Sequence, residues 1–484
     1  MNADRNKTFS HLRKESLDIY NRLKSIEEDI KFVNQVHDAY PDFPLLPNLR
    51  CGAWYTDPRL AAPHPVYFKS TDGHFANWSF NLRRANLHLL NLSHRGIVLV
   101  DSTRSGKRMP DALSKTVPIW CTVVNRAVCL RHRETPRQNW DISLHTPPGV
   151  VSTQEHSQIV PLLDGWAESL NKSSYRVPDL TLPLRPIWIT PASSSFPKFS
   201  PTEQTFIPII CVSASRQVEE GFDRRSGGFV YIQGSGDDHE LWGMGLNPGI
   251  FWHNRERILS ANRSEVETII TSCVNGPQNT DTVRLPSAVA RVNGRILLCA
   301  TSDLIVSSPG HLSTTCSGES GDVAYLVLSS RDRNDMSTDD AQNVLYIPTP
   351  DGKKGHPHFL QMALPRAMEF VQTQLTEGMR VCIACDSGKD LSIGVATAAL
   401  QKYFDDEGNF VVNGLHDIIP GRYNTLIIYI LCLPTNYTLL DKRTIRMRLE
   451  WIIAARPEAN PARDTLKRVN EFLLTSNSFL RRRC

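Results

Sequence analysis

The segment Gly96–Val128 constrains the fold of this chain most strongly, because it follows the pattern strand, loop, helix. The β-branched apolar run Ile97–Val100 predicts the strand, and Pro110 favours the first turn of the helix. Between them lies Asp101–Arg108, a loop of hydroxyls, one glycine and three cations. This arrangement is typical of a phosphate-binding loop, although a solvated basic turn has the same composition. We favour phosphate binding because the strand, the loop and the helix start coincide.

Length and composition are typical of a soluble globular protein with two or three domains. No apolar run in the 484 residues is long enough for a membrane-spanning helix, and the first residues lack the apolar core of a signal peptide. The eleven cysteines are irregularly spaced, as free thiols in a reducing compartment are. We therefore expect a cytoplasmic protein with no membrane partner, and we expect it to be a monomer.

The positive charge is concentrated in two regions. Residues 83–137 contain eleven lysines and arginines against three acids, and residues 441–484 contain eleven against five. The whole chain has a formal net charge of only +4, so the remaining segments are acidic. Two basic regions on an acidic chain indicate a focused anionic partner such as nucleic acid, although an uneven surface without function is the alternative.

Strands that alternate with helices predict an α/β fold. A long amphipathic helix ends before Pro41, and its polar face is expected to be solvated; that face carries Lys24, Glu27, Glu28, Asp29 and Lys31. Another helix is expected over residues 77–90. Apolar runs predict buried strands at 187–190, 206–212 and 229–232.

The pattern of elements changes near residue 280. We expect an N-terminal mixed α/β domain at 1–280, a connecting β-rich segment at 281–355 packed on the C-terminal domain, and a C-terminal α/β domain at 356–484. The last domain ends in two amphipathic helices, the first of which is expected to direct its basic residues outward; these are Lys442, Arg443, Arg446 and Arg448.

Two further polar loops contain groups suited to catalysis. Lys69–His74 combines a cation, two hydroxyls, a carboxylate and an imidazole, although Asp72-Gly73 is also an ordinary turn signal. Gly234–Glu240 contains the adjacent carboxylates Asp237 and Asp238, which are groups that Mg²⁺ accepts as ligands. The same two aspartates are equally suited to cap the next helix or to hydrogen-bond a ribose, so they form only a weak metal motif.

A second strand–loop–helix unit begins at Arg380. Its loop resembles the phosphate loop of dual-specificity phosphatases, in which a Cys is followed by Gly at +3, Arg at +6 and Ser or Thr at +7. Cys385, Gly388 and Ser392 are in register with that pattern, but Leu391 replaces the arginine that clamps the phosphoryl group. Phosphatase chemistry is therefore disfavoured, while an anion-binding loop with Lys389 as its cation remains open.

Five motifs together resemble the fungal and plant initiator tRNA phosphoribosyltransferases, in the order of that family and over nearly the whole chain. They are KSTDGH (69–74), DSTRSGKRMPDALSKT (101–116), GFVYIQGSGDDHE (228–240), CDSGKDLS (385–392) and NPARDTL (460–466). The resemblance implies transfer of 5-phosphoribosyl from phosphoribosyl diphosphate to the 2′-hydroxyl of adenosine 64 in initiator methionine tRNA. It implies that the modification keeps this tRNA out of elongation. It also implies a C-terminal domain that is dual-specificity-phosphatase-like.

The donor that the resemblance implies carries two anionic groups, so we expect cationic and hydroxyl-rich loops to bind them. The expected phosphate-binding residues are Ser102, Thr103, Arg104, Ser105, Gly106, Arg108, Lys115, Ser387, Gly388, Lys389 and Ser392. Lys69 and Lys107 are expected to assist catalysis, and either Asp72 or Asp101 to accept the proton of the hydroxyl. Mg²⁺ is expected with the diphosphate, with Asp237 and Asp238 as weak candidate ligands, and no organic cofactor is expected.

The basic regions are expected to bind the phosphates of the tRNA and its A-form shape. The candidate residues are Arg83, Arg84, Arg443, Arg446, Arg481, Arg482 and Arg483. Two other functions remain open at this stage. One is a phosphatase or phosphoesterase that uses Cys385 as nucleophile, and the other is a non-catalytic tRNA-binding protein.

Overall fold

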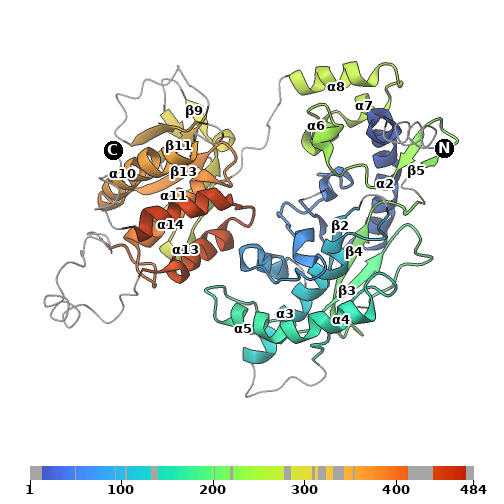
Figure 1. The fold of residues 1–484 in the computed structure, drawn as a ribbon, viewed down its shortest axis with the longest axis horizontal. Coiled ribbons are helices and arrows are strands. Elements are labelled where there is room, and N and C mark those ends of the chain that lie inside the picture. Colours follow the sequence, from blue (N-terminus) through green and yellow to red (C-terminus); the bar gives the residue numbers. More distant parts are fainter. Residues whose placement is uncertain are drawn as a thin grey trace, which may run out of the picture. The chain divides into compact units, whose positions relative to one another are not determined.

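The chain forms two compact units, Met1–Asn279 and Thr280–Cys484, each with its own sheet (Figure 1). The computed structural model describes residues 14–49, 51–92, 94–103, 106–131, 140–200, 202–218, 222–276, 285–307, 311–313, 323–330, 343–350, 352, 355–411 and 440–475. Helices and strands are present in both units, so the α/β class is confirmed. Within these residues, no helix combines the length and the apolar character needed to cross a bilayer.

The main sheet of the first unit has four parallel strands in the order β1-β2-β4-β3. The strands are β1 (Leu45–Pro47), β2 (Ile97–Asp101), β4 (Ile207–Ser213) and β3 (Leu184–Ile189). The central strands β2 and β4 are buried along their whole length, as their apolar sequences predict. Because all four strands run in one direction, the loops at their carboxyl ends meet at one edge of the sheet.

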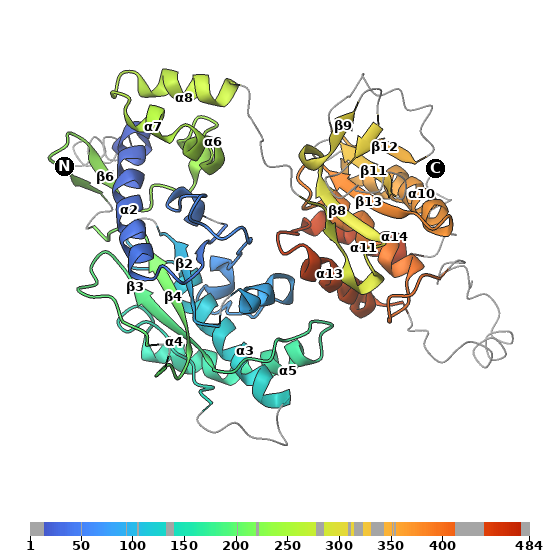
Figure 2. The same ribbon diagram turned by 180° about the vertical axis from the view of Figure 1, so that it is seen from behind.

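Helices cover both faces of this sheet (Figures 1 and 2). One face shares an apolar core with α2 (Ile19–Ala39), α6 (Pro248–His253), α7 (Arg255–Leu259) and α8 (Val266–Asn275). On the other face, α3 (Val117–Arg131) contacts β3 and packs against α5 (Leu163–Asn171), which follows α4 (Thr153–Ile159). A separate antiparallel ribbon, β5 (Phe222–Arg224) and β6 (Val230–Ile232), lies beside α2.

Helix α2 is the long helix that the sequence predicts before Pro41. Its start is fixed by Asp18, whose Oδ1 accepts a hydrogen bond from the backbone N of Asn21 at 2.8 Å. Its polar face is not uniformly solvated, however. Asp29 is only 3% exposed, so the expectation of a solvated side chain is wrong for this residue.

Residues 77–90 do not form the helix expected from their sequence. They contain two short 3₁₀ turns, Leu82–Arg84 and Leu87–Asn91. Asn86, between the turns, has a φ of 49°, in the left-handed region, and this backbone conformation interrupts any continuous right-handed helix.

The main sheet of the second unit has five strands in the order β12-β11-β13-β8-β7. Strands β12 (Val344–Pro348), β11 (Val323–Ser329), β13 (Arg380–Cys385) and β8 (Ile296–Ala300) are parallel, and β7 (Ser287–Ala288) is antiparallel at the edge. Strands β8, β11 and β12 precede residue 356, where the C-terminal domain was expected to begin, and they share one sheet with β13, which follows it. A short hairpin of β9 (Ile305–Ser307) and β10 (His311–Ser313) contributes Leu312 to the apolar cluster on one face.

The helices of the second unit pack in two layers. Helices α10 (Leu364–Thr376) and α11 (Leu391–Tyr403) lie against β13, and α9 (Gly355–His358) precedes α10. Helices α13 (Lys442–Ala455) and α14 (Arg463–Leu474) then pack against α11 (Figure 1). Asp441 caps α13 by accepting hydrogen bonds from the backbone N of Arg443 and of Thr444, both at 2.8 Å.

Candidate functional site

Asp101 lies at the carboxyl end of the central strand β2 and is completely buried. Its Oδ2 accepts a hydrogen bond from Asn48 Nδ2 at 2.8 Å, and its Oδ1 accepts from Cys51 Sγ and from the backbone N of Ser102, both at 2.8 Å. Asn48 follows strand β1, so this carboxylate joins two neighbouring strand ends. In this arrangement Asp101 holds the start of the loop in place and is not exposed to a ligand.

A buried hydrogen-bond chain continues from Ser102 to helix α2. Ser102 Oγ and Ser215 Oγ lie 2.7 Å apart, and Ser215 Oγ donates to Asp29 Oδ2 at 2.6 Å. The hydroxyl of Tyr231 donates to Asp29 Oδ1 at 2.7 Å. Burial raises the pKa of Asp29 to about 8, although the hydrogen bonds from Ser215 and Tyr231 oppose the rise. Sequence reasoning missed Asp29, because one acid on the polar side of an amphipathic helix gives no signal of burial.

The Lys69–His74 turn packs directly against Asp111–Thr116, the segment that opens the helical region after the loop. A Cβ atom on Gly73 would lie 2.8 Å from the carbonyl oxygen of Asp111 and 2.8 Å from Oγ1 of Thr116, so only glycine fits there. Thr116 Oγ1 also donates a hydrogen bond to the carbonyl of Lys69 at 3.1 Å. Two motifs that are separated in sequence thus form one surface.

Asp111 holds two cations of this surface. Its carboxylate pairs with Lys107, and with Lys115 at 2.9 Å; Lys115 also lies 3.1 Å from Glu155 Oε1. Burial raises the pKa of Asp111, but hydrogen bonds from the two lysines outweigh that effect and lower it below its usual value. The Lys107 side chain is 54% exposed, whereas that of Lys115 is only 10% exposed. Lys107 is therefore presented to solvent, with Lys115 behind it.

Asp72 and Arg84, predicted as a general base and a tRNA contact, form an ion pair with each other. Arg84 donates to both carboxylate oxygens of Asp72, the shortest distance being 2.9 Å from Nη2 to Oδ2. The side chain of Asp72 is 13% exposed and that of Arg84 is 10% exposed. Arg84 also lies over the ring of Tyr67. Its guanidinium is thus committed to contacts within the protein in this structure.

The third motif closes the same edge of the sheet. Gln233 Nε2 donates to the carbonyl of Lys107 at 2.7 Å, and the backbone N of Gly236 donates to the hydroxyl of Tyr55 at 2.8 Å. A Cβ atom on Gly236 would lie 2.8 Å from the Trp54 ring, which explains the glycine. The loops at 69–74, 101–116 and 233–238 therefore meet around Lys107.

Asp237 and Asp238, the weak candidate metal ligands, lie near the guanidinium of Arg22. Arg22 Nη1 donates to the carbonyl of Asp237 at 3.3 Å. Burial lowers the pKa of Arg22, and the charges of Asp237 and Asp238 oppose that shift. Within the described part of the chain, no group of three or more His, Cys, Asp or Glu side chains is placed to hold a metal ion.

The second strand–loop–helix unit carries the Cys385 loop, defined as residues 385–392. Cys385 Sγ lies 3.1 Å from Ser392 Oγ, and Leu391 stands at the position of the phosphatase arginine. Asp386 accepts hydrogen bonds from Ser329 Oγ at 2.6 Å and from the backbone N of Ser330 at 3.0 Å. Asp390 Oδ1 accepts from the backbone N of Ala462 at 2.8 Å. Two carboxylates thus fix this loop to neighbouring segments.

The buried side chain of Arg456 supports the Cys385 loop from the protein interior. Its Nε donates to the carbonyl of Gly388 at 2.7 Å, and its Nη1 donates to the carbonyl of Leu298 at 3.3 Å. Gly388 has a φ of 63°, and a Cβ atom there would lie 2.7 Å from Arg456 Nη2. Lys389 is exposed, Ser392 is buried, and Ser387 Oγ accepts from the backbone N of Lys389 at 3.2 Å.

The predicted tRNA contacts differ in exposure. Arg83, Arg443 and Arg446 are exposed. Arg448, expected to face outward, is 1% exposed and bonds to Asp406 Oδ1 at 2.7 Å, so that expectation is wrong. A helical period brings Arg448 close to the inward face of α13, where its Nη2 donates to Asp406 Oδ1 and to the carbonyl of Phe404. Arg104, Ser105, Arg481, Arg482 and Arg483 lie outside the described residues.

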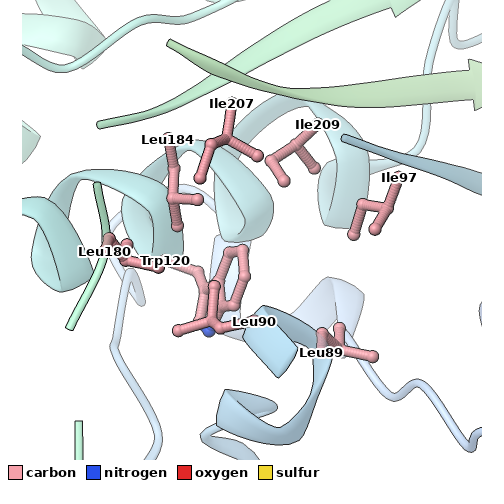
Figure 3. Close-up of a pocket in the computed structure, with 8 residues that line it drawn as sticks. All are labelled: Leu89, Leu90, Ile97, Trp120, Leu180, Leu184, Ile207 and Ile209. Atoms are coloured by element: carbon pink, nitrogen blue, oxygen red, sulfur yellow. The ribbon is translucent and has the colours of Figure 1, made fainter. Parts of the chain in front are cut away.

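A small cavity lies in the first unit (Figure 3). It lies where β2, β3 and β4 begin, and its lining is apolar: Leu89, Leu90, Ile97, Trp120, Leu180, Leu184, Ile207 and Ile209. Trp120 Nε1 is bonded to the carbonyl of Ala85 at 2.7 Å. This lining offers no charge to an anionic ligand, so the cavity is unsuited to bind a phosphorylated substrate.

Two family models match the chain. The model of the Rit1 N-terminal domain matches residues 12–275, and the model of the Rit1 DUSP-like domain matches residues 343–473. The chain is 35% identical over 467 residues to an uncharacterized protein of Schizosaccharomyces pombe, covering 95% of this chain and 94% of that protein. It is 33% identical over 513 residues to a Saccharomyces cerevisiae protein, tRNA A64-2′-O-ribosylphosphate transferase, covering 96% of this chain and 93% of that protein.

Similar solved structures include two phosphatase-related proteins. A mouse putative dual specificity phosphatase complexed with zinc tungstate is 14% identical, with 42% of this chain and 96% of that chain covered and a TM-score of 0.25. A leucine rich repeat and phosphatase domain containing protein from Entamoeba histolytica is 10% identical, with 41% and 98% covered and a TM-score of 0.23. These scores are too low to support an argument, so the DUSP-like character of the second unit rests on the family model.

Proposed function

This chain belongs to the Rit1 family, and from that premise we propose that it is a tRNA-modifying transferase that adds ribosylphosphate to the 2′-hydroxyl of adenosine 64 in initiator methionine tRNA. The support from sequence is the 33% identity, over 96% of the chain, to the yeast tRNA A64-2′-O-ribosylphosphate transferase. The support from geometry is that three of the sequence motifs meet around Lys107, at the carboxyl edge of a parallel sheet.

The donor in this proposal is phosphoribosyl diphosphate. The 2′-oxygen of the acceptor forms a bond to the anomeric carbon of the donor, while the bond from that carbon to the diphosphate oxygen breaks. The acceptor proton passes to a carboxylate, and diphosphate leaves with the electron pair of the broken bond. The diphosphate would be bound together with Mg²⁺, because this small, hard cation is commonly held by substrate phosphates and one or two carboxylates. Asp237 and Asp238 are the weak candidates for those carboxylates, and the cation would neutralise charge on the leaving diphosphate.

The cations for the donor come from the surface around Asp111. Lys107 is exposed and Arg108 is exposed beside it, so both are accessible to a phosphate oxygen. Lys115 is held between Asp111 and Glu155, where it fixes the carboxylate that positions Lys107. We therefore assign Lys107 and Arg108 to direct phosphate contact, and Lys115 to support of Lys107.

The two candidate bases have different surroundings. Asp101 is completely buried and bonded to three neighbours, which suits a positioning role. Asp72 lies in a surface turn, with its side chain 13% exposed. A carboxylate has about four lone-pair positions, so the bidentate contact with Arg84 leaves Asp72 able to accept a hydroxyl proton. We therefore assign the base role to Asp72.

The decisive experiment measures transfer of labelled phosphoribosyl diphosphate to tRNA. We expect label on initiator methionine tRNA and none on the same tRNA with a 2′-deoxy nucleotide at position 64, because that change removes only the acceptor oxygen. Elongator methionine tRNA is the second control. Absence of label from the unmodified initiator tRNA would leave the chain as a binding protein, and equal label on the 2′-deoxy tRNA would place the acceptor elsewhere.

A further inference from the structure

Phe75 directly follows the Lys69–His74 turn, and its side chain is 62% exposed. Among the Phe, Tyr and Trp side chains whose exposure the structure describes, it is the only exposed one. Single exposed apolar side chains are common on protein surfaces. Phe75 differs from the others in its position, because it directly follows the Lys69–His74 turn of the candidate site.

The ring is held in a defined position. Phe75 contacts Trp78 edge to face, with ring centroids 5.4 Å apart and an interplanar angle of 77°. Ala76, between them, has a φ of 60°, a left-handed conformation that alanine rarely adopts. The backbone N of Asn77 donates to the carbonyl of His74 at 2.9 Å, which closes the turn. Phe75 is thus the tip of an ordered turn.

The carboxylate of Glu155 connects the Phe75 turn to the cationic surface around Asp111. Trp78 Nε1 donates to Glu155 Oε1 at 3.0 Å, and Lys115 Nζ lies 3.1 Å from that same oxygen. Lys115 in turn pairs with Asp111, which also holds Lys107. His74, the neighbour of Phe75, lies 3.7 Å from Asp111. The exposed ring and the proposed phosphate-binding lysine therefore share one supporting network.

We propose that Phe75 is a tRNA-binding residue that packs its ring against the ribose-lined groove beside the acceptor hydroxyl. This inference rests on the proposed function. The 2′-hydroxyls of A-form RNA line a wide and shallow minor groove, which a protruding apolar side chain can enter. Arg83 is exposed and adjoins Arg84, which pairs with Asp72 of the same turn, so the charge of Arg83 is suited to a flanking tRNA phosphate. A second protein is a poorer occupant, because a single ring among charged groups offers little apolar area.

The test compares Phe75→Ala with Leu241→Ala. Leu241 is 73% exposed and lies in the same unit, so its truncation controls for the loss of an exposed apolar side chain. For Phe75→Ala we expect the KM for initiator tRNA to rise on the order of tenfold. We also expect an unchanged KM for phosphoribosyl diphosphate and an unchanged unfolding temperature. For Leu241→Ala we expect no change. Phe75→Tyr is expected to keep most of the affinity, because it retains the ring.

Direct tRNA binding, measured by fluorescence anisotropy without donor, separates this inference from the proposed function. A loss of affinity in Phe75→Ala supports the tRNA contact even if the wild-type chain transfers no label. Unchanged tRNA affinity together with an unchanged KM for tRNA overturns the inference while leaving the transferase intact. A rise confined to the KM for the donor, or equal losses in Phe75→Ala and Leu241→Ala, also overturns it.

Discussion

The two strand–loop–helix units of this protein have opposite arrangements of charge. The loop after β2 presents the cations Lys107 and Arg108 at the surface, and a buried acid, Asp29, supports it through Ser215 and Ser102. The Cys385 loop carries the carboxylates Asp386 and Asp390, and a buried cation, Arg456, supports it from inside.

This difference decides which loop is suited to an anionic substrate. Exposed lysines and arginines attract a phosphate, whereas an exposed carboxylate such as Asp386 repels it. The acids of the first unit differ, because Asp101 is buried and Asp111 is paired with two lysines. The Cys385 loop keeps Lys389, but it lacks the arginine that a phosphatase uses and has Leu391 in its place. The first loop is therefore the better phosphate site, although both follow the same pattern in sequence.

The largest expected effect is on Lys107. Lys107→Ala should lower phosphoribosyl transfer on the order of a hundredfold, because it removes an exposed cation from the donor. Lys389→Ala, the matched change in the Cys385 loop, should alter transfer less than twofold. Initial rates with labelled donor measure both, and tRNA affinity should stay the same in each. A similar loss of transfer in the two variants would contradict the proposed difference between the two loops. A parallel loss of tRNA affinity in Lys107→Ala would mean that Lys107 contacts the tRNA and not the donor.

The second expected effect concerns Arg456, the internal support of the Cys385 loop. Arg456→Ala removes the guanidinium that donates to the carbonyls of Gly388 and Leu298 and pairs with Glu458, which should lower the free energy of unfolding by about 2 kcal/mol. Denaturant-induced unfolding measures this loss. Arg443→Ala, an exposed arginine on α13, should cost about 0.5 kcal/mol or less. Equal values for the two variants would show that the loop does not depend on Arg456.

The positions of the loop after β2 and of the Cys385 loop could be predicted from the sequence. The balance of charge in each loop could not. Apolar runs bounded by polar loops located β2, β4 and β13 correctly. The contacts that distinguish the loops, such as Asp29 with Ser215 or Arg456 with Gly388, join residues that are far apart in sequence. A single sequence carries no periodic signal for such pairs. The pairing of Asp72 with Arg84 escaped prediction too, since residues 77–90 form 3₁₀ turns where a helix was expected.

The third expected effect is a pH dependence from Asp29, the internal support of the first loop. Its pKa is raised to about 8 in the folded chain, against an ordinary value of 3.8. Between these values the folded state holds a proton that the unfolded state has lost, so stability falls as pH rises from about 4 to about 8. Besides burial, hydrogen bonds from Ser215 and Tyr231 and the charges of Glu28 and Arg216 act on Asp29, and Asp29 also interacts electrostatically with Tyr55.

Asp29→Asn removes that titration while keeping a polar side chain of the same size. The wild-type chain should therefore lose about 1 kcal/mol per pH unit between pH 5 and 8 relative to this variant. Thermal unfolding at several pH values measures the difference. Parallel stability curves for the two proteins would mean that Asp29 is already ionised in the folded chain, and the buried support of the first loop would then be a charge.

The smallest expected effect is at Cys385, where the comparison predicts no catalytic loss. Its Sγ lies beside Ser392 Oγ, but the arginine needed to stabilise a phosphoryl transition state is missing, and Asp386 and Asp390 stand in the same loop. Cys385→Ser should keep full phosphoribosyl transfer, and the wild-type chain should not hydrolyse an aryl phosphate. Hydrolysis by the wild-type chain that Cys385→Ser abolishes would reverse the comparison, because the Cys385 loop would then be the reacting one.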